Sequence, residues 1–122
     1  QAVLHQRLEG TGIYLEVALS DAAAYLALPR TWGLTLPDAP VGGAHAGYRV
    51  YPCADGRVAL AALEPHFAAR LCAAVGVTLQ SPHDMLLPAT HAAVAAFLQE
   101  QTRAALDALA RDKDIPLHTL PP

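Results

Sequence analysis

The sequence predicts a mixed α/β domain in which a small, mostly antiparallel sheet with a β-hairpin is flanked by helices. Apolar residues recur at helical spacing in several segments, and two β-prone runs flank an Asp-Gly pair near the middle of the chain. Hydrophobic residues make up 53% of the 122 residues and charged residues 16%, so the chain can bury a core and is not disordered. This length fits one domain.

The N-terminal third predicts a helix, a strand and a second helix. Residues 1–9 place their apolar side chains on one helical face. Residues 12–19 alternate apolar and other side chains, which is typical of a half-buried strand. Residues 22–28 form a helical pattern that must end before Pro29, and residues 29–47 are a connector rich in proline and glycine.

The clearest local signal is a predicted hairpin between residues 48–53 and 57–63. The pair Asp55-Gly56 lies between the two runs, and Asp-Gly favours a tight turn whose central residues have positive φ. Pro52 cannot donate a ladder hydrogen bond, so we expect the first strand to lie at a sheet edge or to contain a bulge.

The second half predicts two helices and a last strand. A helix begins at Pro65, directly after Glu64, faces Phe67, Leu71 and Val75 inward, and ends at Gly76. After a loop over 77–89, a long helix is expected from Thr90 to Ala110, with a buried stripe of Val94, Leu98, Ala105 and Leu109 and a solvent-exposed ion pair between Arg103 and Asp107. Residues 115–120 predict a short edge strand.

Composition excludes several classes of function. The net charge is −3 and the basic residues are scattered singly, so nothing indicates nucleic acid or an anionic membrane as a partner. No apolar stretch approaches the roughly 20 residues that cross a bilayer, and no signal peptide precedes the first element, which predicts a cytoplasmic protein. Cys53 and Cys72 have no metal-like spacing, and we expect two reduced thiols.

Glu64 is the most informative polar residue. It lies where an apolar strand turns into a helix, and the helix N-terminus favours its ionised form. Such junctions often carry reactive groups in α/β proteins, but a carboxylate there is also an ordinary electrostatic cap. Both interpretations stay open on the residues alone.

Other candidate sites are weaker. The glycine-rich segment 41–47 matches neither dinucleotide nor P-loop spacing, so we interpret it as a mobile connector with an exposed His45. The six histidines have no paired spacing for zinc, and Ser20-Asp21 with any histidine is no recognisable triad. Ser81 and Asp84 are expected in a turn, and Tyr25 and Trp32 in a core or an interface. We therefore predict no cofactor, no metal and no nucleophile.

Two stretches resemble the family III CoA-transferases, which include formyl-CoA and carnitine-CoA transferases and α-methylacyl-CoA racemases. They are GTGIYLEVALSDAAAYL from Gly10 and GGAHAGYRVYPCADGRVALAALEPHFAARLCAAVG from Gly42. The tail QTRAALDAL with DIPLHTL is similar to the end of the family pattern. Two features depart from the family pattern: the linker before Tyr48, which contains His45, is one residue longer than usual, and Leu106 replaces an expected tryptophan.

The resemblance implies that residues 1–122 are the small, C-terminal domain of a two-domain enzyme that works as a homodimer. Such enzymes move CoA between carboxylic acids or racemise 2-methylacyl-CoA, and the CoA thioester is a substrate, not a cofactor. The catalytic aspartate, or the histidine and aspartate of the racemases, lies in a large domain upstream, so this chain should be inactive alone. Glu64 matches a racemase-type glutamate that approaches the catalytic histidine.

An alternative is a non-catalytic binding or assembly module that acts with a separate partner chain. The ends of the sequence bear on this choice, because it starts at Gln1 without a methionine and stops at Pro122 directly after an apolar stretch. We therefore expect a piece of a longer protein. Apolar surface that a large domain would cover should then favour self-association.

Overall fold

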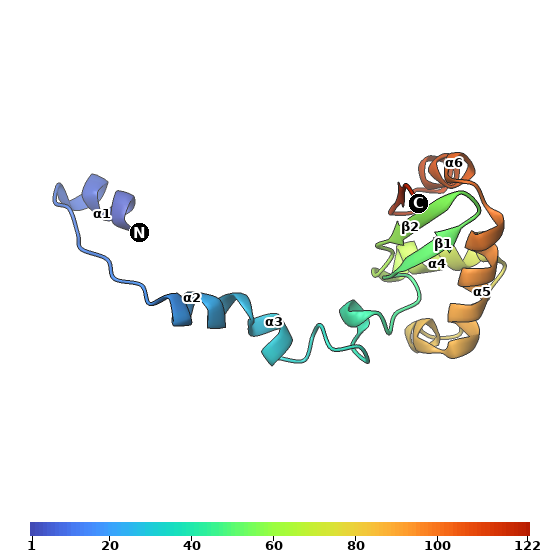
Figure 1. The fold of residues 1–122 in the computed structure, drawn as a ribbon, viewed down its shortest axis with the longest axis horizontal. Coiled ribbons are helices and arrows are strands. Elements are labelled where there is room, and N and C mark those ends of the chain that lie inside the picture. Colours follow the sequence, from blue (N-terminus) through green and yellow to red (C-terminus); the bar gives the residue numbers. More distant parts are fainter. The chain divides into compact units, whose positions relative to one another are not determined.

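The computed structural model describes residues 1–122, which form two compact units, Gln1–Trp32 and Gly33–Pro122. Figure 1 shows the elements of each unit along the chain. The larger unit contains the three-stranded sheet and all of the buried core, so the fold class predicted from the sequence is confirmed. No helix of the chain is long and apolar enough to cross a membrane.

The first unit consists of helices α1 (Ala2–Glu9), α2 (Leu19–Leu26) and α3 (Leu28–Thr31), none of which has a buried residue. The helix expected over 1–9 is confirmed. The strand expected over 12–19 is wrong, because residues 12–18 have no regular structure. A strand needs a neighbour for its backbone hydrogen bonds, and this unit contains no strand at all. The expected core or interface residues Tyr25 and Trp32 are also exposed.

The second unit is built on a sheet of strands β1 (Val50–Cys53), β2 (Gly56–Leu60) and β3 (Leu117–Leu120), in that order and antiparallel throughout. The predicted hairpin, the edge position of Pro52 and the last edge strand are therefore confirmed. Tyr51 pairs with Val58, which pairs in turn with Thr119. This register puts the buried side chains on one face of the sheet.

The hairpin turn differs from the prediction. Cys53 pairs with Gly56, so the central residues are Ala54 and Asp55, and neither they nor Gly56 has positive φ. A Cβ on Gly56 would lie 2.6 Å from the Leu120 carbonyl oxygen and 2.9 Å from Arg103 Cδ. The glycine is therefore needed for close packing of the neighbouring strand and helix, and not for turn geometry.

Helices cover the buried face of the sheet. They are α4 (Pro65–Val75), α5 (Pro88–Glu100) and α6 (Arg103–Lys113), with the short 3₁₀ turns η1 (Pro40–Gly42) and η2 (Pro82–Leu86) in the connections. Helix α5 packs against β1 and α6 against β3, as Figure 1 shows. Helix α4 begins at Pro65 and ends at Gly76 in the left-handed conformation, as predicted.

The single helix expected from Thr90 to Ala110 is wrong, because the chain breaks between α5 and α6. Gln101 is extended, and Thr102 caps α6 by accepting a hydrogen bond from Ala105 N at 3.2 Å. The hairpin turn forms two hydrogen bonds with the residues between α5 and α6. The Asp55 carboxylate accepts from Arg103 N at 2.7 Å, and Ala54 N donates to Gln101 O at 2.9 Å. These contacts provide hydrogen-bond partners for the free backbone groups at the end of α5 and the start of α6, which a continuous helix would pair internally.

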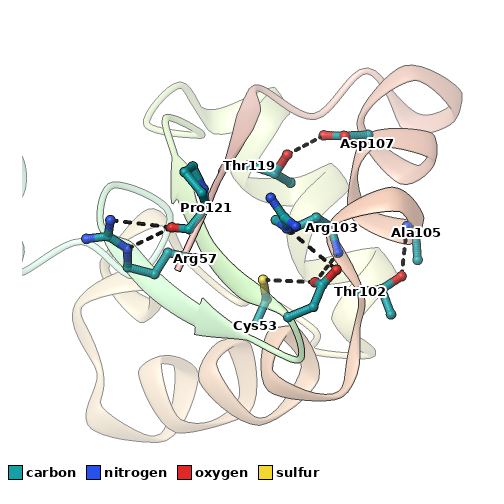
Figure 2. Close-up of polar contacts among 9 residues, drawn as sticks. Cys53, Arg57, Thr102, Arg103, Ala105, Asp107, Thr119 and Pro121 are labelled. Atoms are coloured by element: carbon teal, nitrogen blue, oxygen red, sulfur yellow. Dashed lines mark hydrogen bonds and ion pairs between the residues drawn. The ribbon is translucent and has the colours of Figure 1, made fainter.

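The break also changes which side chains are paired and buried. Arg103 Nε lies 3.5 Å from the Asp55 carboxylate, and Asp107 accepts from the Thr119 hydroxyl at 3.0 Å, so the expected Arg103–Asp107 pair is wrong (Figure 2). Leu106 is fully buried, whereas Ala105 of the expected stripe is exposed. The stripe is therefore correct in α5 and at Leu109, which is partly buried against the core, and it is wrong at Ala105, where Leu106 is buried instead.

The core lies between the sheet and the helices. Its members share near-complete burial and come from every layer; the largest are Leu71, Met85, Leu98, Leu106, Val58, Val94 and Cys72. Cys53 and Cys72 are both buried free thiols, as expected. Burial raises the pKa of the Cys72 thiol. The core therefore rests on aliphatic packing within Gly33–Pro122.

Candidate functional site

Glu64 is the N-cap residue of α4. Its backbone is extended, with φ −67° and ψ 143°, and Pro65 occupies the first turn. The side chain is exposed, makes no capping hydrogen bond and takes part in neither ion pair of the chain. The carboxylate thus sits at the positive end of the helix dipole and is available to a group outside the chain.

His45 is buried, at 8% exposure, so its expected position in an exposed, mobile connector is wrong. Its Nδ1 accepts a hydrogen bond from the Gly47 backbone N at 3.1 Å. A ring nitrogen that accepts carries no proton, so the proton of the neutral ring is on Nε2. Burial lowers the pKa of His45, and the neighbouring His91 lowers it further, so the neutral form is favoured.

His91 and Tyr51 hold the segment around His45 in place. His91 Nε2 lies 2.7 Å from the Ala44 carbonyl oxygen, and its Nδ1 lies 3.3 Å from the Tyr51 hydroxyl. That hydroxyl donates to the Ala46 carbonyl oxygen at 2.9 Å. Burial raises the pKa of Tyr51, against a smaller opposing effect of Arg49. Two carbonyls that flank His45 are therefore fixed by side chains of α5 and β1.

Backbone contacts complete this arrangement. Ala46 N donates to Met85 O at 2.8 Å, and Ala62 N donates to Gly47 O at 2.8 Å. A Cβ on Gly47 would lie 2.5 Å from the Ala62 carbonyl oxygen, so only glycine allows this approach. Because Ala62 lies two residues before Glu64, the same contacts hold the segment of His45 beside the connection between β2 and α4.

A cavity of about 250 Å³ opens at this point. Its walls come from three parts of the second unit: the segment of His45, the chain from Leu63 into α4, and the loop that leads into η2. The lining residues are His45, Leu63, Pro65, Ala68, Leu79, Gln80, Ser81 and Pro82. No hydrogen bond from His45 Nε2 occurs within the chain, and this atom is not sealed from solvent. The cavity is therefore mainly apolar, and its polar side chains are those of His45, Gln80 and Ser81.

A second, wider cavity of about 610 Å³ lies along the hairpin and the glycine-rich segment. Its lining includes Gly42, Gly43 and Arg49. A Cβ on Gly42 would lie 1.6 Å from the Leu36 carbonyl oxygen, so this glycine is explained by backbone packing. The segment ends in a hairpin strand and does not lead into a helix that would bind phosphate.

The other candidate residues have structural partners or lie apart. Ser81 and Asp84 form a capping box at the start of η2. Hydrogen bonds from Gln80 N and Ser81 N lower the pKa of the Asp84 carboxyl. No three of the histidine, cysteine, aspartate and glutamate side chains come together as metal ligands. Ser20 and Asp21 lie in α2 of the first unit.

The fold and the position of Glu64 place the chain among mixed α/β domains with an exposed carboxylate at a strand-to-helix junction. The chain matches the family model of CoA-transferase family III over residues 1–120, and it belongs to this family. The resemblance found in the sequence is thereby confirmed.

Comparison with solved structures finds a similar fold in Rv3272 from M. tuberculosis, solved in an orthorhombic crystal form. The TM-score is 0.68 at 18% identity, covering 96% of this chain and 34% of Rv3272. The chain thus spans about a third of that protein. A comparison with curated proteins gives no match.

Proposed function

We propose that the chain is the small domain of an acyl-CoA enzyme that transfers CoA between carboxylic acids or racemises a 2-methylacyl-CoA. Family membership over residues 1–120 is the observation that carries this proposal. In this proposal a larger domain supplies the catalytic aspartate, or the histidine and aspartate pair, and the chain alone is inactive. The intact protein is a cytoplasmic homodimer whose substrate is an acyl-CoA, and no separate cofactor takes part.

Glu64 is the proposed contribution of this domain. An exposed carboxylate without a partner in the chain can approach a histidine of the larger domain, orient its ring and favour its charged form. For racemisation, this histidine would act as acid or base at the α-carbon. Glu64 is thus a positioning residue, and the free carboxylate at the N-cap of α4 supports this role.

The test assays the chain alone and together with the large domain that its gene or a neighbouring gene encodes. CoA transfer is followed by mass spectrometry of the acyl-CoA products, and α-proton exchange by deuterium uptake from heavy water. We expect no activity from the chain alone. In the assembled enzyme, E64Q should lower kcat by about 10²-fold or more and change the pH profile, because the histidine loses its carboxylate partner.

E100Q is the matched control, since Glu100 is exposed at the end of α5, away from the strand-to-helix junction. It should leave kcat and the pH profile unchanged. Turnover by the isolated chain would contradict the domain proposal. Equal kcat and pH profiles for E64Q and E100Q would contradict the role of Glu64 and leave the family assignment intact.

A further inference from the structure

The cavity beside His45 has the features of a built site. A polar side chain more than nine-tenths buried lines an otherwise mainly apolar wall, and its Nε2 has no partner in the chain. This Nε2 donor is accessible to solvent, so the oxygen of a bound ligand can take the place of the water that otherwise satisfies it. The fixed neighbours of His45 mean that this donor is held in one place.

The tautomer of His45 determines what the cavity can bind. Because Gly47 N donates to Nδ1, the neutral ring presents one N–H at Nε2 and no lone pair. The walls contributed by Leu63, Ala68 and Leu79 suit a compact apolar group. The matching ligand therefore has one neutral hydrogen-bond acceptor next to a short branched or linear alkyl group.

The volume of the cavity limits which part of an acyl-CoA can bind in it. A volume of about 250 Å³ is below the roughly 300–1,000 Å³ typical of sites that enclose a drug-sized ligand. The cavity can hold a fragment of an acyl-CoA but not the nucleotide and the pantetheine arm together. A short acyl group with its thioester carbonyl fits both the volume and the His45 donor.

We propose that this cavity binds the acyl end of a short-chain thioester, with His45 Nε2 donating a hydrogen bond to the thioester carbonyl oxygen. The inference deepens the proposed function and rests on it for the choice of thioester over other neutral carbonyl compounds. His45 would then be a substrate-binding residue in the same domain as Glu64, whose chain neighbours Leu63 and Pro65 line the cavity. A donor at this oxygen also stabilises the negative charge that develops there when the α-proton is removed or when a carboxylate attacks the thioester carbonyl; the charge returns to the C=O bond as the CoA thiolate leaves.

The experiment uses the full chain and small probes. S-isobutyryl-N-acetylcysteamine supplies the thioester, S-isobutyl-N-acetylcysteamine is the thioether without the carbonyl, and isobutyrate supplies a charged acceptor. Binding is followed by nitrogen-15 and proton NMR of the histidine side chains. We expect the thioester to shift the His45 Nε2 resonance, and the thioether to bind about threefold to tenfold more weakly, because it lacks one neutral hydrogen bond.

H45F removes the donor and keeps an aromatic ring, and H118F is the control because His118 is exposed on β3. H45F should reduce thioester affinity to that of the thioether, and H118F should not change it. If H45F does not fold, the change of the His45 Nε2 resonance on adding the thioester to the unmodified chain still tests the proposal. The proposal is overturned if the thioester leaves that resonance unmoved, if both probes bind equally, or if isobutyrate binds best. None of these results depends on turnover, so they leave the proposed function untouched.

Discussion

Replacing Gly47 by alanine tests whether backbone packing holds His45 in its place. The new Cβ would lie 2.5 Å from the Ala62 carbonyl oxygen and 3.2 Å from His45 Cε1. Ordinary contacts between such atoms are about 3.5 Å, so the two segments must move apart by about 1 Å. That movement also weakens the bond from Ala62 N to Gly47 O.

The expected magnitude follows from these contacts. Overpacking costs about 1–3 kcal/mol, the weakened hydrogen bond about 1 kcal/mol, and the lower entropy of the unfolded alanine chain returns about 0.5 kcal/mol. We expect the free energy of unfolding of G47A to fall by about 1.5–3.5 kcal/mol relative to the unmodified chain.

Urea unfolding followed by circular dichroism measures this change. Fluorescence of Trp32 is unsuitable, because this residue belongs to the first unit. G12A is the control, since a Cβ on Gly12 meets nothing within 4 Å and the residue has no positive φ. It should change stability by less than about 0.5 kcal/mol. A G47A chain as stable as G12A would show that the segment relaxes freely, and the argument for a fixed His45 would fail.

Three further substitutions test the packing around α6. L106A should cost about 2–5 kcal/mol of unfolding free energy in urea titrations, because Leu106 is fully buried, whereas L87A at a 42% exposed position should cost far less. T102A should cost about 1 kcal/mol through the lost cap, and an unchanged transition midpoint would contradict the cap. The hydrogen bond from Arg103 N lowers the pKa of Asp55, so the ionised Asp55 carboxylate stabilises the fold above about pH 4 and this stabilisation is lost below it. The difference in unfolding free energy between the unmodified chain and D55N should therefore shrink on acidification. A difference that stays constant with pH would contradict this role of Asp55.

The elements of the second unit could largely be predicted, because their signals are local. The apolar pattern after Pro65, the glycine at its end and the two β-prone runs depend on nearby residues, and α4 and the hairpin were located correctly. The break at Thr102 was missed although a threonine before a helical turn is an ordinary N-cap. The apolar pattern continued across it, and only the contact with Asp55 shows why the chain bends there.

The surroundings of His45 could not be predicted, because its partners are distant in sequence. Its segment is held by Tyr51 and by His91, and the Ala46 backbone bonds to Met85. A segment with three glycines between Val41 and Tyr48 looked like a mobile connector, whereas Gly47 allows a close approach that orders it. The only signal in the sequence was His45 two residues before Gly47, and a histidine near a glycine is weak evidence by itself.

Residues 12–18 have the alternation of a strand without the partner that a strand needs. Ile13, Leu15 and Val17 are all exposed, and no strand exists in the first unit to accept the backbone hydrogen bonds. We expect the amides of 13–17 to exchange with deuterium within seconds in the isolated chain, while those of β2 are protected by pairing on both sides. Hydrogen–deuterium exchange with mass spectrometry measures both segments in one experiment, with α1 as a second exposed reference. Protection of 13–17 comparable to β2 would mean that the alternation is satisfied by pairing within or between copies of the chain. The absence of a strand there would then reflect a missing neighbour and not a failure of the sequence pattern.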